Sequence, residues 1–163
     1  MQTQVQRCKT IVSGILMSAG ETRGESSGET SVWEFFDDLS SEWASTRKIG
    51  EFSFGNHFGE DVDIASDTVL KQTIYNLLDN ALEASPDWVG LEVYREDNML
   101  LIRVIDRGPG FAKDIFNRLG QPYQSTKGRP GSGLGLFLVF NVARILGGQV
   151  KARNRSEGGA EIA

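Results

Sequence analysis

The apolar positions at the start of the chain repeat at the spacing of a helix. They follow one another at intervals of three and four residues, which places them on a single seam. The seam consists of Val5, Cys8, Val12, Ile15 and Ala19. It suits either pairing with other helices or packing on the chain's own domain, and both interpretations stand. Residues 20–30 then contain no apolar side chain, which predicts a linker and a domain boundary.

A second helix is predicted directly after this linker. Ser31 begins a capping box with the glutamate three residues later, and apolar residues at helical spacing predict a helix over about 32–46. Short extended runs at 51–54 and 61–65 border a glycine-containing turn, which predicts a hairpin-like arrangement. His57, the only histidine, falls in that turn.

The strongest helical pattern covers residues 67–85, with an N-cap at Ser66 or Asp67. One face of this helix is apolar and the opposite face is polar. The apolar face carries Leu70, Ile74, Leu77, Leu78 and Ala81. The polar face carries Asn76, Asn80 and Glu83.

Extended and helical patterns alternate through the rest of the chain. Residues 89–95 and 99–106 predict two strands joined by a hairpin turn. Residues 110–130 show no period and predict a basic loop. Residues 132–146 are apolar almost all round, which predicts a buried helix. Final strand pieces are predicted at 149–152 and 160–163.

Length and composition indicate one soluble globular domain. The chain has 163 residues, of which 39% are hydrophobic and 24% charged. Its apolar stretches are too short to span a bilayer and its start lacks a signal-peptide core, so no membrane contact is expected. The single cysteine favours a reducing compartment. The formal charge of −5 argues against nucleic-acid binding as the main task.

Glycine is unusually frequent, at 19 of 163 residues, and two clusters of it suggest chemistry. Asp106 ends an apolar strand before the first cluster, so its carboxylate can accept a hydrogen bond from an adenine amine; an ordinary Asp turn is the alternative. The second cluster, at 131–135, opens a helix whose free N–H groups favour phosphate, unless it is simply a tight loop. The spacings match neither a P-loop nor a Rossmann fingerprint.

The two asparagines of the polar helix face offer carboxamide oxygens. Such oxygens can share in a Mg²⁺ shell that is completed by water and substrate phosphates. Taken alone, Asn76 and Asn80 are more simply interpreted as solvated residues.

The order and spacing of these motifs resemble the ATP-binding domain of sensor histidine kinases, in which N, G1, F and G2 boxes follow one another. The matching segments are Asn76-Leu-Leu-Asp-Asn80-Ala, Asp106-x-Gly-x-Gly110, an aromatic-bearing basic loop, and Gly131-Ser-Gly-Leu-Gly-Leu136. The resemblance covers about residues 31–163 and extends to gyrase-type, mismatch-repair and heat-shock chaperone ATPases. It implies an α+β fold, a two-layer α/β sandwich in which three helices cover a mixed, mostly antiparallel sheet. An ATP lid is expected above the helical layer.

The resemblance also assigns roles to individual residues. Asn80 is expected to bind Mg²⁺, and Asn76 to lie beside the metal or phosphate. Asp106 is expected to bind the adenine amine, and Lys127 to reach the phosphates from the lid. Asn76 and Lys127 are the expected catalytic residues. The other expected contacts of ATP are Glu83, Ala84, Gly108, Gly110, Phe111, Tyr123, Ser125, Thr126, Gly131, Ser132, Gly133, Leu134, Gly135 and Leu136.

Several positions depart from the family pattern. Phe116 and Tyr123 replace the double phenylalanine of the F box, Glu83 replaces a basic residue, and Ala160 replaces the usual threonine. Hydrolytic relatives carry a glutamate base where this chain has Asn76, and an amide cannot act as a base at neutral pH. The resemblance therefore favours a kinase over an ATP hydrolase. A non-catalytic nucleotide-binding module remains an alternative.

The kinase interpretation requires an acceptor histidine outside this chain. His57 is followed by Phe-Gly in a predicted turn, whereas the family's acceptor lies in a long helix, so we expect His57 to be structural. By resemblance, residues 1–19 are the end of a dimerisation helix, 20–30 a linker and 31–163 the catalytic domain, so the chain is expected to be a fragment. The resemblance also implies that the intact protein forms a homodimer, has a response regulator as partner and keeps this domain in the cytoplasm. Whether the intact protein has an inner-membrane anchor is left open.

The segment around Cys8 resembles the second dimerisation helix of redox-responsive proteobacterial kinases that control respiration and photosynthesis genes. That subgroup has a redox-active cysteine at this place, and the flanking Arg7 and Lys9 favour the thiolate. A small hydrophobic residue on the helix seam explains Cys8 equally well.

Overall fold

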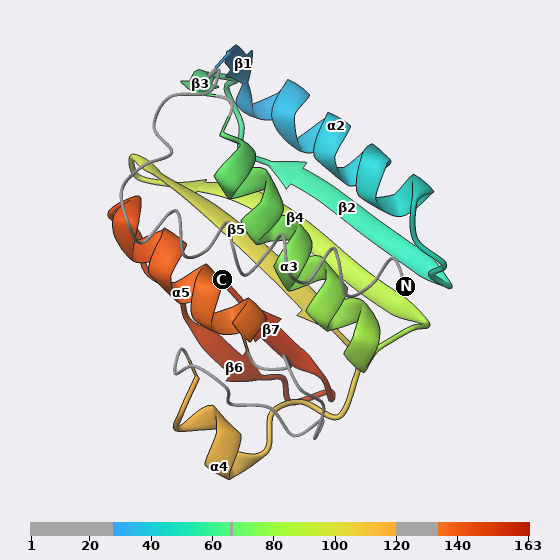
Figure 1. Ribbon diagram of the computed structural model, residues 1–163. Helices are drawn as coiled ribbons and strands as arrows, with labels where there is room; N and C mark the ends of the chain where they lie inside the picture. The colour runs from blue at the N-terminus through green and yellow to red at the C-terminus, as the bar shows by residue number, and fades with distance from the viewer. Residues whose placement is uncertain (1–27, 66, 120–133) are drawn as a thin grey trace.

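The computed structural model describes residues 28–65, 67–119 and 134–163. Strands and helices are interspersed along the chain (Figure 1). In order they are β1 (Glu29–Ser31), α2 (Val32–Ser45), β2 (Glu51–His57), β3 (Asp63–Ala65), α3 (Thr68–Ala84), β4 (Trp88–Glu96), β5 (Met99–Asp106), α4 (Lys113–Phe116), α5 (Leu134–Ile145), β6 (Ala152–Asn154) and β7 (Ala160–Ile162).

Five strands form one mixed sheet in the order β2-β4-β5-β7-β6. β2 runs parallel to β4, and the remaining neighbours are antiparallel. The helices α2, α3 and α5 lie on one face of this sheet (Figure 1). The expected two-layer α+β sandwich with a mostly antiparallel sheet is therefore confirmed.

The long helices begin where the sequence predicts. The Ser31 side chain accepts the backbone N–H of Glu34 at 3.2 Å, and Asp67 accepts that of Val69 at 2.8 Å. These bonds satisfy N–H groups that have no partner within the first helical turn. The second N-cap is Asp67, which settles the choice between the two predicted positions.

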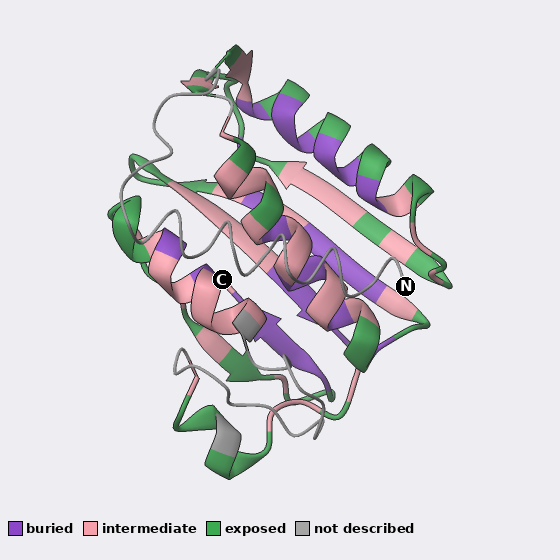
Figure 2. Cartoon of the chain, viewed as in Figure 1, coloured by how far each residue is buried: buried purple, intermediate pink, exposed green. Residues whose placement is uncertain are grey.

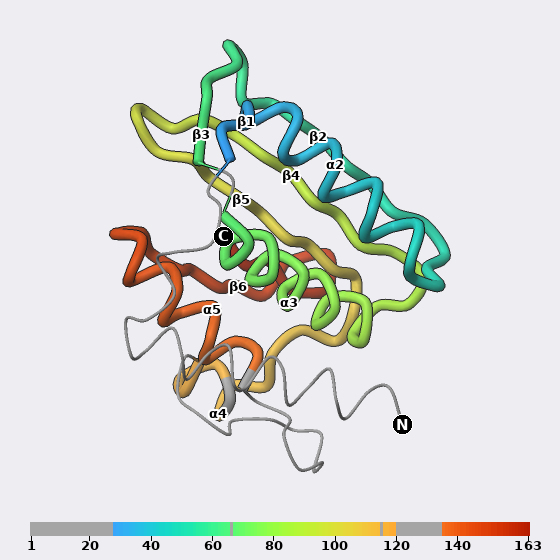
Figure 3. The backbone as a smooth tube through the Cα atoms, turned by 45° about the horizontal axis from the view of Figure 1, so that its top comes forward, coloured from blue at the N-terminus to red at the C-terminus, as the bar shows by residue number. Residues whose placement is uncertain are grey.

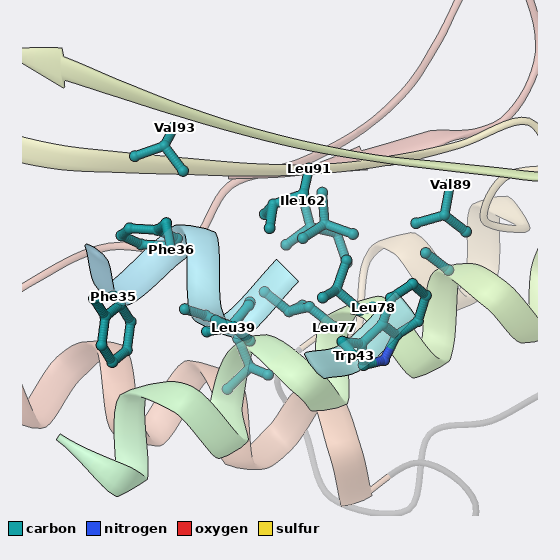
Figure 4. Packing of buried hydrophobic residues seen from close by; sticks show 14 of the residues in the cluster. Phe35, Phe36, Leu39, Trp43, Leu77, Leu78, Val89, Leu91, Val93 and Ile162 are labelled. Atoms are coloured by element: carbon teal, nitrogen blue, oxygen red, sulfur yellow. The ribbon is translucent and has the colours of Figure 1, made fainter. Parts of the chain in front are cut away.

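One hydrophobic core fills the space between the helices and the sheet. α2, α3 and β4 all contribute side chains to it, and Ile162 joins from β7 (Figure 4). The largest fully buried side chains are Trp43, Phe36, Leu39, Ile74, Leu78, Leu91, Val32, Val89 and Val93. The apolar face predicted for α3 is the one that enters this core, which leaves its polar face at the surface of the layer.

The predicted hairpin between residues 51–54 and 61–65 is wrong. β2 pairs in parallel with β4, and the short β3 pairs with β1. A parallel pair needs a long crossover, which α3 supplies, and local turn residues carry no information about that pairing. His57 is the last residue of β2 and stacks on Tyr94, with ring centroids 4.9 Å apart.

Helix α5 is less buried than its apolar sequence predicts. Val139 and Val142 are buried, whereas Ile145 and Leu146 are 55% and 53% exposed. The helix lies beside α3 toward the β6 edge of the sheet, so only part of its circumference meets other elements (Figures 2 and 3).

Other differences are small. The predicted loop at 110–130 includes the short helix α4 in its described part, and β6 starts at Ala152, later than predicted. β1 begins at Glu29, within the predicted linker.

Polar side chains fix α3 against α2. The Asp79 carboxylate accepts the indole N–H of Trp43 at 2.8 Å and two hydrogen bonds from the Arg47 guanidinium at 2.9 and 3.1 Å. The hydrogen bonds to Asp79 raise the pKa of Arg47 above its usual value. An ion pair also joins Lys71, near the start of α3, to Glu42, near the end of α2. Because Asp79 adjoins Asn80, these contacts set the rotation of the polar helix face.

We predict that Asp79→Ala destabilises the fold more than Asp79→Asn. Alanine leaves the indole N–H of the fully buried Trp43 without its acceptor, at a cost of about 1–3 kcal/mol. Asparagine keeps an acceptor oxygen and loses mainly the half-exposed ion pair with Arg47, which contributes about 0.5 kcal/mol. Urea unfolding of both variants measures the difference. Equal losses of unfolding free energy would show that the charge, and not the indole acceptor, matters.

Candidate functional site

The carboxylate of Asp106 lies buried at the end of β5. Its Oδ1 accepts the backbone N–H of Gly108 at 2.8 Å and that of Ala160 at 3.2 Å. Within the described part of the chain, no hydrogen bond to Oδ2 is found. One oxygen is thus used to orient the carboxylate, and the other can accept an N–H group of a ligand.

The two glycines after Asp106 allow the loop to approach its neighbours. A Cβ on Gly108 would lie 2.6 Å from the carbonyl oxygen of Ala84, at the end of α3. A Cβ on Gly110 would lie 2.8 Å from Oδ1 of Asn154, and its φ of +75° is strained for other residues. The Ala84 carbonyl and the Asn154 side chain therefore occupy the space that side chains at these two glycines would need. Through these contacts the loop packs against α3 and β6.

Gly159 brings a third segment to the same point. With a φ of +88°, its backbone packs so closely on the Asp106 carbonyl that any side chain would collide with it. The neighbouring residue Ala160 then places its N–H on the Asp106 carboxylate. The hairpin between β6 and β7 thus packs directly on Asp106.

Asn76 and Asn80 lie half-buried on the polar face of α3, one turn apart. A Cβ on Gly135 would lie 3.2 Å from Nδ2 of Asn80, so the first turn of α5 faces this asparagine. Asn80 also lies one turn before Ala84, the residue that Gly108 contacts. Along α3 the order is therefore the Asp106 loop, then Asn80, then Asn76, and Gly135 of α5 lies against Asn80.

The donor set around Asn80 suits a weakly chelated divalent cation. Among the described residues, no group of three or more His, Cys, Asp and Glu could hold a metal ion. The carboxamide oxygen of the half-buried Asn80 is a ligand type that fits a cation which retains water and phosphate ligands, as Mg²⁺ does. Glu83 is exposed on the same helix.

Part of the predicted site lies outside the described residues. This applies to Tyr123, Ser125, Thr126, Lys127, Gly131, Ser132 and Gly133, and also to Cys8. Of the others, Leu136 packs against the core, and the Phe111 ring lies 6.3 Å from that of Phe116. Their predicted contacts with ATP stay predictions.

Two residues that the sequence analysis did not single out, Asn154 and Arg155, form hydrogen bonds with the Asp106 loop. Asn154 exchanges two hydrogen bonds of 2.8 Å with the backbone of Phe111. Arg155 donates to the Asp106 carbonyl at 3.4 Å. These partners are 43 and 49 residues apart, and no local pattern signals such pairs.

None of the helices in the described part of the chain has the length and apolar character needed to cross a membrane.

Comparison with known proteins bears on this site. The family model described as histidine kinase-, DNA gyrase B-, and HSP90-like ATPase matches residues 65–163. The signal transduction histidine-protein kinase AfsQ2 of Streptomyces coelicolor is 41% identical over 98 residues, which cover 56% of this chain and 18% of AfsQ2. Sporulation kinase A of Bacillus subtilis is 34% identical over 92 residues, covering 55% of this chain and 15% of the kinase. The chain thus spans less than a quarter of the length of these relatives.

Solved structures share the fold. Full-length ShkA in complex with AMPPNP has a TM-score of 0.73 at 24% identity, over 94% of this chain and 34% of ShkA. The mycobacterial sensor histidine kinase MprB has a TM-score of 0.68 at 24% identity, over 83% of this chain and 94% of the MprB chain. The solved structures show the shared fold, and the family match shows that the chain belongs to the histidine kinase-, DNA gyrase B- and HSP90-like ATPase family.

Proposed function

We propose that this chain binds Mg²⁺-ATP and, in the intact protein, donates the γ-phosphate to a histidine in a dimerisation domain outside the chain. The observation that carries the proposal is the layout along α3. Among the described residues, only one oxygen of the Asp106 carboxylate has hydrogen-bond donors, and the loop that follows Asp106 adjoins the end of α3. One helical turn away, Asn80 faces Gly135 in the first turn of α5.

The Asp106 carboxylate supplies a means of recognising adenine. Its Oδ1 is held by two backbone N–H groups, so Oδ2 has a fixed position. Adenine presents an exocyclic amine donor, whereas guanine presents a carbonyl oxygen at the corresponding atom. A fixed acceptor therefore favours ATP over GTP.

Asn80 and the start of α5 are suited to the phosphates. Bound Mg²⁺ would supply charge neutralisation of the phosphates, with the Asn80 oxygen as one ligand. The first N–H groups of α5 and its helix dipole favour negative charge beside Asn80. Lys127 would add a positive charge, as the resemblance implies.

Asn76 favours transfer over hydrolysis. Its amide can position a phosphate or a metal-bound water but cannot remove a proton from water. Transfer to a neutral imidazole needs no such base, because its nitrogen lone pair attacks the γ-phosphorus directly. The P–N bond forms as the bond from phosphorus to the bridging oxygen breaks, and ADP leaves.

His57 does not lie in a helix. It is the last residue of β2 and stacks on Tyr94, with ring centroids 4.9 Å apart. The family's acceptor, as the resemblance implies, lies in a long helix. The acceptor is therefore proposed to lie in the partner domain of the intact protein.

The wider setting is proposed from the same resemblance. The intact protein would form a homodimer through the helix at 1–19, pass the phosphate to a response regulator and keep this domain in the cytoplasm. If Cys8 has a redox role, as in the redox-responsive subgroup, oxidation should cross-link two chains through Cys8. The resulting dimer should be visible on a non-reducing gel and should be missing for the Cys8→Ser variant.

The fate of γ-labelled ATP tests the proposal. The chain is incubated with Mg²⁺ and labelled ATP, and a separate dimerisation domain with an acceptor histidine is then added. We expect bound, intact ATP at first and labelled acceptor afterwards. Sustained release of phosphate would indicate a hydrolase, label retained on the chain would indicate an internal acceptor, and bound ATP without transfer would indicate a non-catalytic module.

We predict that Asp106→Asn weakens ATP binding while the fold is kept. The amide oxygen can still accept the Gly108 and Ala160 N–H groups, but the NH₂ group then faces the adenine amine. The dissociation constant for ATP should rise about 10- to 100-fold, and the preference for ATP over GTP should fall. Titration calorimetry with both nucleotides measures this, with Asp63→Asn on β3 as control. An unchanged ATP affinity would contradict the assigned pocket.

We predict that Asn80→Ala removes the effect of Mg²⁺ on ATP binding. Loss of a ligand oxygen to a charged group should weaken Mg²⁺-ATP binding by about tenfold or more, while binding in EDTA changes little. The matched control is Asn98→Ala, an exposed asparagine in the turn between β4 and β5. If ATP binding by the Asn80→Ala variant depends on Mg²⁺ as strongly as that of the wild type, the metal binds elsewhere.

A further inference from the structure

Asn154, the last residue of β6, uses both ends of its side-chain amide on one residue of the loop after β5. Its Oδ1 accepts the N–H of Phe111 at 2.8 Å, and its Nδ2 donates to the carbonyl oxygen of Phe111 at 2.8 Å. This pair of bonds imitates one rung of a β-ladder. It fixes both the distance and the rotation of the Phe111 peptide relative to β6.

The same hairpin also fixes the beginning of this loop. Ala160 donates its N–H to the Asp106 carboxylate, and Gly159 packs on the Asp106 carbonyl. Arg155 donates to that carbonyl at 3.4 Å. Residues 106–111 are therefore attached at their first residue by β7 and its turn, and at their last residue by Asn154.

Between these attachments, Gly108 is held by its hydrogen bond to Asp106 and by its close approach to Ala84. The segment after Gly108 contains Gly110, and glycine loses more conformational freedom on ordering than any other residue. Gly110 adopts a φ of +75° and leaves the room that Oδ1 of Asn154 fills. The path of the loop beyond Gly108 thus depends on the contact between Phe111 and Asn154.

We propose that Asn154 is a positioning residue for base recognition: by fixing Phe111, it sets the path of the loop that carries the adenine pocket. Asn154 does not touch the nucleotide in this account. It acts through Phe111 and the glycines before it, and its loss lets the loop shift relative to Asp106. The inference rests on the proposed ATP site and names a residue of the β6–β7 hairpin that determines its selectivity.

The isosteric variant Asn154→Asp separates the two bonds. A carboxylate still accepts the Phe111 N–H but cannot donate to the Phe111 carbonyl, and it repels that oxygen instead. Asn154→Ala removes both bonds. Lys151→Ala, an exposed residue three positions earlier, is the matched control.

The experiment measures, for each variant, the dissociation constants for Mg²⁺-ATP and Mg²⁺-GTP, the unfolding midpoint and the exchange rate of the Phe111 amide proton. For both Asn154 variants we expect ATP binding to weaken about tenfold, with a smaller loss for GTP, so that the ATP preference falls. Phe111 should exchange at least about tenfold faster in Asn154→Ala, while the Gly108 amide stays protected. The unfolding midpoint should stay close to that of Lys151→Ala.

Two results would overturn the inference. A lower unfolding midpoint with an unchanged ATP-to-GTP ratio would assign Asn154 to general stability. Wild-type ATP affinity in both variants would remove Asn154 from nucleotide binding altogether while leaving the proposed function intact. Failure of the wild-type chain itself to bind ATP would instead contradict the proposed function, and this inference with it.

Discussion

The site depends on the way the Asp106 carboxylate is held at the end of β5. Burying a carboxylate costs free energy unless hydrogen-bond donors compensate for the lost water. Here two backbone donors bind one oxygen, Gly108 from the loop itself and Ala160 from β7. Three parts of the chain must therefore fold correctly before this acceptor exists: the end of β5, the glycine loop after it and the β6–β7 hairpin.

Helix α3 links this site to the stability of the whole domain. Its apolar face packs in the core against α2 and β4, and its opposite face presents Asn76 and Asn80. Asp79, directly before the proposed metal ligand, is fixed by Trp43 and Arg47 of the α2 region. Rotation of α3 would disturb the core and the site together, so the packing of the helix keeps Asn80 against Gly135 at the start of α5.

Much of this arrangement could be predicted from the sequence because its signals are local. The helices at 32–46 and 67–85 have an N-cap, a regular apolar period and a defined end, and the strands before and after residues 97–98 alternate around a tight turn. Asp106, Gly108 and Gly110 could be singled out because they lie within five residues of one another. A carboxylate at the end of an apolar strand is followed there by two glycines.

The rest depends on contacts between distant segments. The partner of β2 is β4 across a crossover, which turn residues near 55–59 could not reveal. The partial exposure of α5 reflects its place at one side of the sheet, and an apolar sequence alone does not give that place. Asn154 finds Phe111 at 43 residues' separation, and Arg47 finds Asp79 at 32. Such pairs follow from the fold and not from any local pattern.

In the proposed site ATP lies along α3, with its adenine on Asp106 and its phosphates beside Asn80. A crystal structure of this chain with Mg²⁺ and a non-hydrolysable ATP analogue would locate the nucleotide. We expect the exocyclic amine of adenine within hydrogen-bond distance of Asp106 Oδ2, and the metal bound to the Asn80 oxygen. A nucleotide bound away from α3, or an adenine amine directed away from Asp106, would contradict the proposed site.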